Sequence, residues 1–386
     1  MREKIIEVIG ESTLSGGSTS FLTLVKGLDK KKFDITCICP PGSLAGMLKE
    51  VRGVDVEVIS MRSKWDFRAV RKIRKLITKL QPLSSKLIVH CHGVRGGWLG
   101  RLACIGPRHK APKVVYSEHL WTREYRLKNP LSYFPQLAGL WFLDLFTDIT
   151  ICVSGAVADF LVDKNITRPD KVIVIYNGIE THKLTSKLKP QTSKVKIGFV
   201  GSLVKRKGVE YLIEAIDILS KRYTLNPKLL IIGEGKDKEK LQDLAKKLGL
   251  KDKIEFKGLV KNVDAIYPTL DIYVQPSIDE SFGIAALEAM SYGLPIIATS
   301  VGGLKEILGF REIVSDKLKK EPYVLTDFGI IISPKNSSSI AEAIRHLIKS
   351  KKTREKLSKN SQKRAKLFSA DNMVKNIEKV YSLVLK

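Results

Sequence analysis

The sequence predicts an α/β protein with two doubly wound domains, each a parallel sheet with helices on both faces. Short apolar, β-branched runs alternate with helical periods, which is the pattern of buried parallel strands. The runs form two series, and a length of 386 residues suits two domains better than one. Ligands of such sheets bind beyond the carboxyl ends of the strands. We therefore expect the functional site in a cleft between the domains.

The elements follow in order along the chain. The first series predicts strands at 5–9, 33–39, 54–59, 86–91, 113–117, 148–153 and 172–176. The second series predicts strands at 195–200, 228–232, 271–274, 295–299 and 329–332. The polar segment 177–194 between them predicts a linker, and the chain from Ser338 onward reads as helices. We therefore expect domains at 1–180 and 181–370, and a helix at 371–386 that packs back on the first domain.

Composition limits the class of protein. The chain has 67 Lys and Arg against 40 Asp and Glu, a net charge of +27 that favours anionic partners. Five cysteines without a C-x-x-C pair argue against disulfides and structural zinc and favour a reducing compartment. The N-terminal run MREKIIEVIG has no apolar signal core, and no stretch approaches about 18 uncharged apolar residues. These features predict a cytoplasmic protein.

The most informative segment runs from Gln275 to Pro295, where a strand leads through a loop to a helix that starts near Gly283. The free N–H groups and the dipole at a helix start attract a phosphate. Glu280 precedes this start and Glu288 lies about 7.5 Å along the helix, so two carboxylates flank the anion site. Carboxylates beside a diphosphate fit sugar or ribose hydroxyls. The structural alternative is a solvated loop acid and an exposed helix residue.

Two more loops follow strands. Lys205, Arg206 and Lys207 are consecutive cations that suit a diphosphate, although basic loops are often only solvated. The segment GESTLSGGST at 10–19 lacks the G-x-G-x-x-G spacing, which disfavours a dinucleotide site. Its adjacent Gly16 and Gly17 would still let a ligand approach the backbone closely.

The six histidines lie in different contexts along the chain. His90 and His92 flank Cys91 at a strand end, and we expect hydrogen-bonded structural residues there. A metal site is disfavoured because no acidic third ligand is evident nearby. His119 ends another strand and is a candidate contact for a reacting sugar, with a plain loop histidine as the alternative. No role is assigned to His109, His182 and His346.

These segments together resemble glycosyltransferase family 4, the retaining enzymes of the GT-B fold that use nucleotide-diphosphate sugars. The resemblance covers nearly the whole chain, and the E-x7-E pair Glu280/Glu288 is its most specific part. The other matching pieces are individually modest. They are Gly16-Gly17, H-x-H-G at 90–93, E-H at 118–119, V-S at 153–154, Y-N-G-I at 176–179, V-G-S-L…K-G at 200–208, G-E-G at 233–235, F-K-G-L-V at 256–260 and A-T-S-V-G-G at 298–303.

The resemblance implies roles for the matching residues. Glu288 would accept hydrogen bonds from the ribose of the donor, and Glu280 would hold hydroxyls of its sugar. Lys207, helped by Arg206, would neutralise the diphosphate, and His119 would lie against the transferred sugar. The residues so implied in catalysis are Glu280, His119 and Lys207. Those implied in donor binding are Gly16, Gly17, Arg206, Lys207, Val260, Glu280, Ser281, Phe282, Gly283, Ile284 and Glu288.

The resemblance also implies contacts by other segments, and the chain departs from the family at two places. The backbone near Val260 would face the nucleotide base, and Gly16-Gly17 would close over the diphosphate. Many members carry an arginine where this chain has Ser202, and Arg206 is the residue that would compensate. The segment 309–324 is longer than the usual connection.

The implied reaction moves a hexose-type sugar, with retention, from a UDP- or GDP-sugar to a hydroxyl of a glycan or lipid-linked acceptor. Cations and a helix start would stabilise the leaving diphosphate without a metal ion or other cofactor. Glu280 would position the sugar rather than attack it. A nucleotide-sugar epimerase of the same fold is the enzymatic alternative. An α-glucan phosphorylase is disfavoured, because it needs pyridoxal phosphate and a far longer chain.

The basic run 62–79 suggests a different class of protein, because it has eight Lys and Arg against the single Asp66. Asp66 is the expected N-cap of a helix. The apolar face of this helix would consist of Val70, Ile73, Ile77 and Leu80. A nucleic-acid-binding protein is the rival interpretation, but no recognised signature of one is present, and we expect no nucleic-acid partner. We favour contact with an anionic membrane, at about 1 kcal/mol per Lys or Arg, which would make the protein peripheral on the inner face. The aromatic-rich segment 121–146 is a further candidate anchor, with buried helix packing as its alternative.

Overall fold

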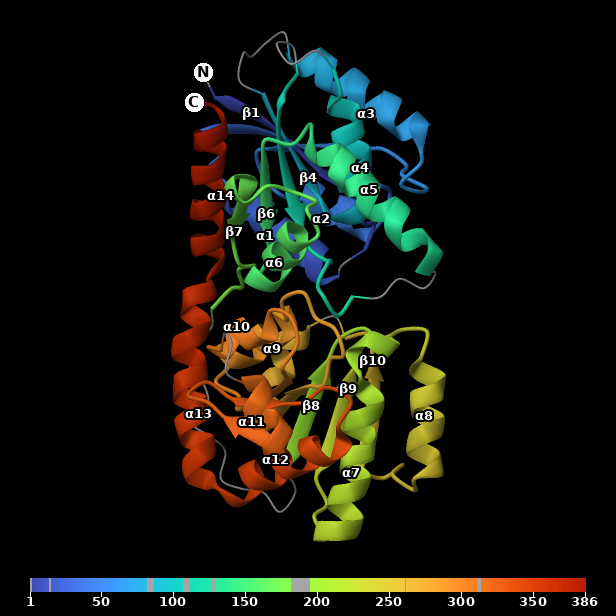
Figure 1. The fold of residues 1–386 in the computed structure, drawn as a ribbon, viewed down its shortest axis with the longest axis vertical. Coiled ribbons are helices and arrows are strands. Elements are labelled where there is room, and N and C mark those ends of the chain that lie inside the picture. Colours follow the sequence, from blue (N-terminus) through green and yellow to red (C-terminus); the bar gives the residue numbers. More distant parts are fainter. Residues whose placement is uncertain are drawn as a thin grey trace. The chain divides into compact units, whose positions relative to one another are not determined.

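The computed structural model divides the chain into two compact units, shown in Figure 1. Unit 1 comprises Met1–Ile179 and Phe368–Lys386, and unit 2 comprises Glu180–Leu367. The structure describes residues 2–13, 15–81, 87–106, 111–125, 130–181, 195–260, 262–310 and 314–386. The predicted linker therefore falls largely outside the described residues. Each unit contains one seven-stranded, mainly parallel sheet, so the predicted fold class of two doubly wound α/β sheets is confirmed.

The sheet of unit 1 is parallel throughout, in the order β3-β2-β1-β4-β5-β6-β7. Its strands are β1 (Glu3–Ile9), β2 (Phe33–Cys39), β3 (Val54–Val58), β4 (Leu87–His92), β5 (Lys113–Glu118), β6 (Ile149–Cys152) and β7 (Val172–Val174). Its helices are α1 (Gly16–Gly27), α2 (Ser43–Lys49), α3 (Phe67–Leu80), α4 (Gly93–Cys104), α5 (Tyr133–Asp144), α6 (Gly155–Asp163) and α14 (Ala370–Val384).

Helices cover both faces of this sheet, which explains why β1 is an almost continuous apolar run. Ile5 and Ile9 pack into a core shared with α1, α2 and α14. Ile6 and Val8 pack into a second core with α3 and α4. The C-terminal helix α14 thus supplies part of the core of unit 1, through residues such as Ile377.

The sheet of unit 2 has the order β10-β9-β8-β11-β12-β14-β13. Its strands are β8 (Lys196–Val200), β9 (Lys228–Ile232), β10 (Ile254–Gly258), β11 (Ile272–Gln275), β12 (Ile296–Thr299), β13 (Tyr323–Leu325) and β14 (Ile330–Ile332). Its helices are α7 (Val209–Tyr223), α8 (Lys238–Lys247), α9 (Ile284–Ser291), α10 (Leu304–Ile307), α11 (Val314–Lys320), α12 (Ser337–Lys349) and α13 (Lys351–Ala365). The segment 309–324, longer than expected for the family, contains α11 among its described residues.

Two edge strands of unit 2 were missed by the sequence pattern. In β10, the exposed Glu255 and Lys257 alternate with apolar residues, so no continuous apolar run marks the strand. The second, β13, has three residues and pairs with β14 in the antiparallel direction. Edge strands are only half covered, and short or charged ones are common because they resist pairing with other chains.

The basic helix α3 begins as predicted. Asp66 is its N-cap, and Asp66 Oδ1 accepts a hydrogen bond from the backbone N–H of Ala69 at 3.1 Å. Val70, Ile73 and Ile77 of the predicted apolar face are buried in the core, and Leu80 packs against its edge. The basic residues consequently lie on the outer side of the helix.

Candidate functional site

The helix α9 begins where the sequence predicts, after a loop that follows β11. Its N-cap is Gly283, with φ +106°, a backbone conformation that residues with a Cβ rarely adopt. A Cβ at Gly283 would also lie 2.5 Å from Leu304 Cδ2. Phe282 is buried, whereas Ser281 and Ile284 are half-buried.

Two neighbouring segments hold the loop that carries Glu280. The carbonyl oxygen of Arg206 accepts the N–H of Ile278 at 2.7 Å and that of Asp279 at 3.3 Å. On the other side, a Cβ at Gly302 would lie 1.7 Å from Glu280 O, so this turn requires glycine. The loop is therefore fixed in place by contacts distant in sequence, which is the condition for a well-positioned side chain.

Glu280 is a buried, ionised carboxylate, with 6% of its surface exposed. Its Oε2 accepts hydrogen bonds from Lys207 Nζ, from Ser277 Oγ at 3.1 Å and from Gln275 Nε2 at 3.4 Å. Burial by itself would raise the pKa of Glu280. The charges of Lys207 and Arg206, with the hydrogen bonds from Lys207 and Ser277, outweigh burial and hold this pKa below its ordinary value. The alternative of a solvated loop acid is excluded.

A tight turn places Lys207 beside the carboxylate of Glu280. The 3₁₀ turn η5 (Lys205–Lys207) follows β8, and Gly208 then takes φ +62°. A Cβ at Gly208 would lie 2.1 Å from Pro276 O, so the turn packs closely on the Glu280 loop. Ser202, where many family members have arginine, is exposed in this structure. Lys207, Arg206 and Glu280 thus lie together within unit 2.

Glu288 lies further along α9 and is half-buried. Its Oε2 accepts a hydrogen bond from Tyr267 OH at 2.8 Å, and the Tyr267 ring stacks on Tyr292 at 5.3 Å between centroids. Burial raises the pKa of Glu288 to about 7; the charge of Asp264 adds to this rise and the Tyr267 hydrogen bond opposes it. Glu288 is therefore largely protonated and neutral below pH 7 and becomes charged as the pH rises through 7.

Sequence reasoning missed Tyr267 altogether. The residue lies in the 3₁₀ turn η7 (Tyr267–Thr269), far from α9 in the chain, and its side chain is completely buried. No local motif marks this residue. A buried tyrosine requires an acceptor for its hydroxyl, and only the folded chain shows that Glu288 provides it.

In unit 1, the glycine pair and His119 are neighbours. Gly16 and Gly17 open α1, and a Cβ at Gly17 would lie 3.8 Å from His119 Cγ. Both ring nitrogens of His119 are buried and, in the part of the chain that the structure describes, have no hydrogen-bond partner. Burial, reinforced by His92 and His90, lowers the pKa of His119 to about 3. His119 is therefore a neutral imidazole, and its two buried ring nitrogens lack a hydrogen-bond partner among the described residues.

The expectation that no acidic group lies near His90 and His92 is wrong. Glu7 on β1 pairs in register with His90 on β4, and its Oε2 lies 2.7 Å from His92 Nε2. Tyr381 OH on α14 donates to Glu7 Oε1 at 2.6 Å and lies 2.6 Å from His90 Nδ1. Potential ligand atoms of Glu7, His90 and His92 lie within 4.8 Å of one another. Because these residues hydrogen-bond one another, Tyr381 and Ser117, they fit a structural network better than a metal site.

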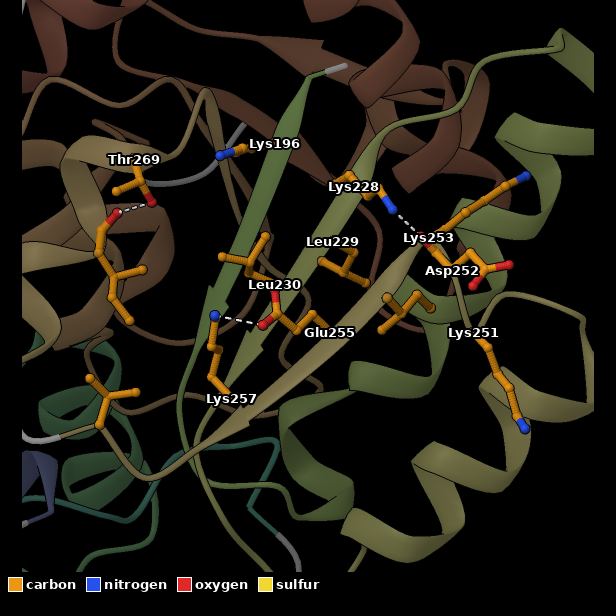
Figure 2. Close-up of a pocket in the computed structure, with 13 residues that line it drawn as sticks. Lys196, Lys228, Leu229, Leu230, Lys251, Asp252, Lys253, Glu255, Lys257 and Thr269 are labelled. Carbon is orange, nitrogen blue, oxygen red and sulfur yellow. Dashed lines mark hydrogen bonds and ion pairs between the residues drawn. The ribbon is translucent and has the colours of Figure 1, made fainter.

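A separate groove of about 770 Å³ lies along β9 and β10 of unit 2, as Figure 2 shows. Five lysines line it, at positions 196, 228, 251, 253 and 257. Lys257 pairs with Glu255 at 2.5 Å. Val260, which follows the end of β10, also lines the groove. No other residue of the predicted donor-binding set lines the groove. Lys257 lies on the edge strand β10, where a charged side chain discourages pairing with other chains.

The two sheets and the Glu280–Lys207 site at a helix start define the class: a glycosyltransferase of the GT-B fold. The chain belongs to glycosyltransferase family 4, a family of nucleotide-sugar-dependent enzymes. Residues 14–183 match Glycosyltransferase Family 4, and residues 181–364 match Glycosyl transferases group 1.

Individual relatives agree with this assignment. An uncharacterised glycosyltransferase of Methanocaldococcus jannaschii is 35% identical over 235 residues, which span 57% of this chain and 56% of that protein. EpsD of Bacillus subtilis, whose name also designates a glycosyltransferase, is 29% identical over 310 residues, 76% of each protein. The crystal structure of HepE from Anabaena in complex with UDP-glucose superposes with a TM-score of 0.77 at 17% identity, covering 99% of this chain and 100% of HepE. The likeness to HepE confirms the GT-B fold.

Proposed function

We propose that the protein is a retaining glycosyltransferase that moves a sugar from a nucleotide-diphosphate sugar to a hydroxyl of a glycan or lipid-linked acceptor. The observation that carries this proposal is the ionised, buried Glu280 held against Lys207 at the start of α9. A buried carboxylate is costly unless it is paired. The presence of such a carboxylate beside cations and a helix start fits a site that holds sugar hydroxyls next to a diphosphate.

In the proposed mechanism, charge develops on the diphosphate as the bond to the anomeric carbon breaks. Lys207, Arg206 and the N–H groups at the start of α9 stabilise this charge. The acceptor oxygen bonds to the anomeric carbon on the same face of the sugar that the diphosphate leaves, and its proton passes to a diphosphate oxygen, so configuration is retained. Glu280 positions the sugar, Glu288 holds the ribose, and His119 contacts the sugar as a neutral group. The mechanism calls for no metal ion or other cofactor.

A thermal-shift and turnover screen with UDP-, GDP- and ADP-sugars tests the proposal. One donor class should raise the melting temperature and release its nucleoside diphosphate, with turnover unaffected by EDTA. A donor at a hundred times its Kd stabilises by about 2.7 kcal/mol. The pKa of Glu288 is about 7. The affinity of the protein for the donor should therefore rise roughly tenfold from pH 6 to pH 8. HepE was crystallised with UDP-glucose, so UDP-sugars come first.

Glu288→Gln is the matched control for this pH dependence, because glutamine cannot ionise. It should bind the donor equally at both pH values. The diphosphate of a sugar nucleotide is a diester and does not titrate in this range, so it adds no pH dependence of its own. Failure of every donor class to stabilise the protein or to release nucleotide would contradict the proposed function.

We further propose that unit 1 contacts an anionic membrane surface. Arg71, Arg74, Lys75, Thr78 and Lys79 line a shallow groove on the outer side of α3. Large apolar side chains are exposed nearby: Trp65 at 57% just before α3, and Phe134 at 77% and Trp141 at 52% on α5. Trp98 joins these two groups, because its ring lies 5.1 Å from that of Trp65 and would be 2.1 Å from a Cβ at Gly139 of α5. Exposed basic and aromatic side chains on neighbouring helices suit an interfacial position.

None of the described helices is long and apolar enough to cross a membrane. Flotation with vesicles tests the surface contact instead. At low salt, the protein should float with vesicles containing phosphatidylglycerol and not with pure phosphatidylcholine. Changing Arg71, Lys75 and Lys79 to glutamate should weaken binding by at least about 100-fold, at about 1 kcal/mol per charge removed.

The matched control changes Lys352, Lys359 and Lys363 of α13 to glutamate, which alters the net charge of the protein equally on unit 2. This variant should still float. An equal loss in both variants would show a general charge effect, and absence of flotation on anionic vesicles would reject the membrane proposal.

A further inference from the structure

Two polar side chains are buried on a strand in the interior of the unit 2 sheet. β11 lies between β8 and β12, and its residues Tyr273 and Gln275 are completely buried. They are two positions apart, so they point to the same face of the strand. Burying polar groups in a sheet costs free energy unless every group is hydrogen-bonded. Apolar residues would pack there more cheaply, so this arrangement calls for an explanation.

The hydrogen bonds from these residues lead directly to Glu280. Tyr273 OH donates to Gln275 Oε1 at 2.7 Å, which leaves the Gln275 amide nitrogen facing the other way. That nitrogen lies 2.9 Å from Ser277 Oγ and 3.4 Å from Glu280 Oε2. Ser277 Oγ in turn donates to Glu280 Oε2 at 3.1 Å. The opposite amide orientation would set a carbonyl oxygen against the carboxylate, so Tyr273 selects the orientation that attracts it.

The loop backbone is fixed as well. Thr299 Oγ1, at the end of β12, donates to the carbonyl oxygen of Ser277 at 2.6 Å. Ser277 is completely buried. Its hydroxyl therefore approaches Glu280 from a position set by two neighbouring strands. The chain of contacts runs from the sheet interior to the carboxylate without passing through solvent-exposed groups.

All the donors converge on one oxygen. Lys207 Nζ, Ser277 Oγ and Gln275 Nε2 each bond to Oε2 of Glu280. Among residues with described positions, none hydrogen-bonds to Glu280 Oε1. We propose that Tyr273, Gln275 and Ser277 are positioning residues that hold Glu280 by Oε2 and thereby present Oε1 to a hydroxyl of the donor sugar. This inference rests on the proposed function of Glu280.

The geometry predicts a specific kinetic defect. A carboxylate released from these bonds can rotate, and small misplacements of a positioning group slow the chemical step strongly. Tyr273→Phe and Ser277→Ala should each lower kcat by about 10- to 100-fold. Affinity for UDP alone should change less than twofold, because UDP lacks the transferable sugar that Glu280 is proposed to hold.

The pH profile separates a positioning role from a merely structural one. Ser277 helps to keep the pKa of Glu280 low. In a Glu288→Gln background, where the titration of Glu288 is absent, removal of the Ser277 hydroxyl should therefore move the acid limb of kcat/KM to higher pH. Ser277→Thr retains a hydroxyl and should restore both kcat and the acid limb. Tyr223→Phe is the matched control: it also removes a tyrosine hydroxyl in unit 2, one that donates to Glu342 far from this loop in the chain. Its kinetics should equal those of the wild type.

The experiment uses the full chain, with UDP-glucose or whichever donor the wild type turns over, and UDP as the binding probe. Unchanged kcat in Tyr273→Phe and Ser277→Ala would overturn the positioning role while leaving the proposed function intact. A parallel loss of UDP affinity, or failure of Ser277→Thr to rescue, would show a structural role and also overturn it. A wild type that releases nucleotide from no donor would refute the proposed function itself, and this inference with it.

Discussion

Glu280→Gln is expected to slow sugar transfer by about 10²- to 10³-fold, the usual cost of removing one preorganised electrostatic contact. Glutamine keeps the shape of the side chain but not its charge. The neutral amide accepts hydrogen bonds from sugar hydroxyls more weakly, and it no longer neutralises Lys207, its ion-pair partner in this structure. Nucleotide release at saturating donor measures the effect.

The matched control is Glu255→Gln, which removes another carboxylate paired with a lysine in the same unit. Because Glu255 is exposed on the edge strand β10, its loss should leave turnover unchanged. The circular dichroism spectra of both variants should match that of the wild type, which would show an intact fold. The melting temperature of Glu280→Gln should fall, because Lys207 loses its charged partner. Full turnover in Glu280→Gln would remove Glu280 from the proposed machinery.

The second large effect is expected on stability, from Tyr381→Phe. The Tyr381 hydroxyl donates to the buried Glu7 carboxylate and contacts His90. Burial by itself would raise the pKa of Glu7, but its electrostatic interactions and hydrogen bonds with His90 and His92 hold this pKa well below its ordinary value. Glu7 therefore stays ionised at neutral pH. Removing one of its hydrogen-bond donors should lower the free energy of unfolding by about 3 kcal/mol, because a buried charge then has one partner fewer.

This cost should lower the melting temperature of unit 1 by roughly 6–12 °C. Tyr223→Phe again serves as the control, since its hydroxyl is only partly buried, and it should shift the melting temperature far less. Equal small shifts in both variants would mean that the Glu7 network contributes little to the attachment of α14. A change in donor affinity without a change in stability would also argue against this structural role.

Local patterns predicted much of the fold and part of the candidate site. Buried parallel strands are continuous apolar runs, so β1, β2 and β8 were recognisable without any tertiary information. The start of α9 and the turn at Gly208 are set by short-range rules for glycine and helix ends. Edge strands such as β10 were not predicted, because their partly exposed residues interrupt the apolar run.

Contacts between distant segments could not be predicted in this way. Glu7 and Tyr381 are 374 residues apart in the chain, yet they share a hydrogen bond. Tyr267 reaches Glu288 from a 3₁₀ turn 21 residues earlier, and that buried setting is why the pKa of Glu288 rises. The polar residues of β11 looked like an ordinary strand until their bonds to Glu280 were seen.

By itself, the sequence determined two parallel-sheet units, a helix start flanked by two carboxylates, and a family resemblance resting mainly on that segment. These features depend on spacing along the chain, because helix ends, strands and tight turns are set by near neighbours. Only the tertiary structure decided the chemical state of each carboxylate. Burial and charged neighbours brought together by folding keep Glu280 ionised and raise the pKa of Glu288 to about 7.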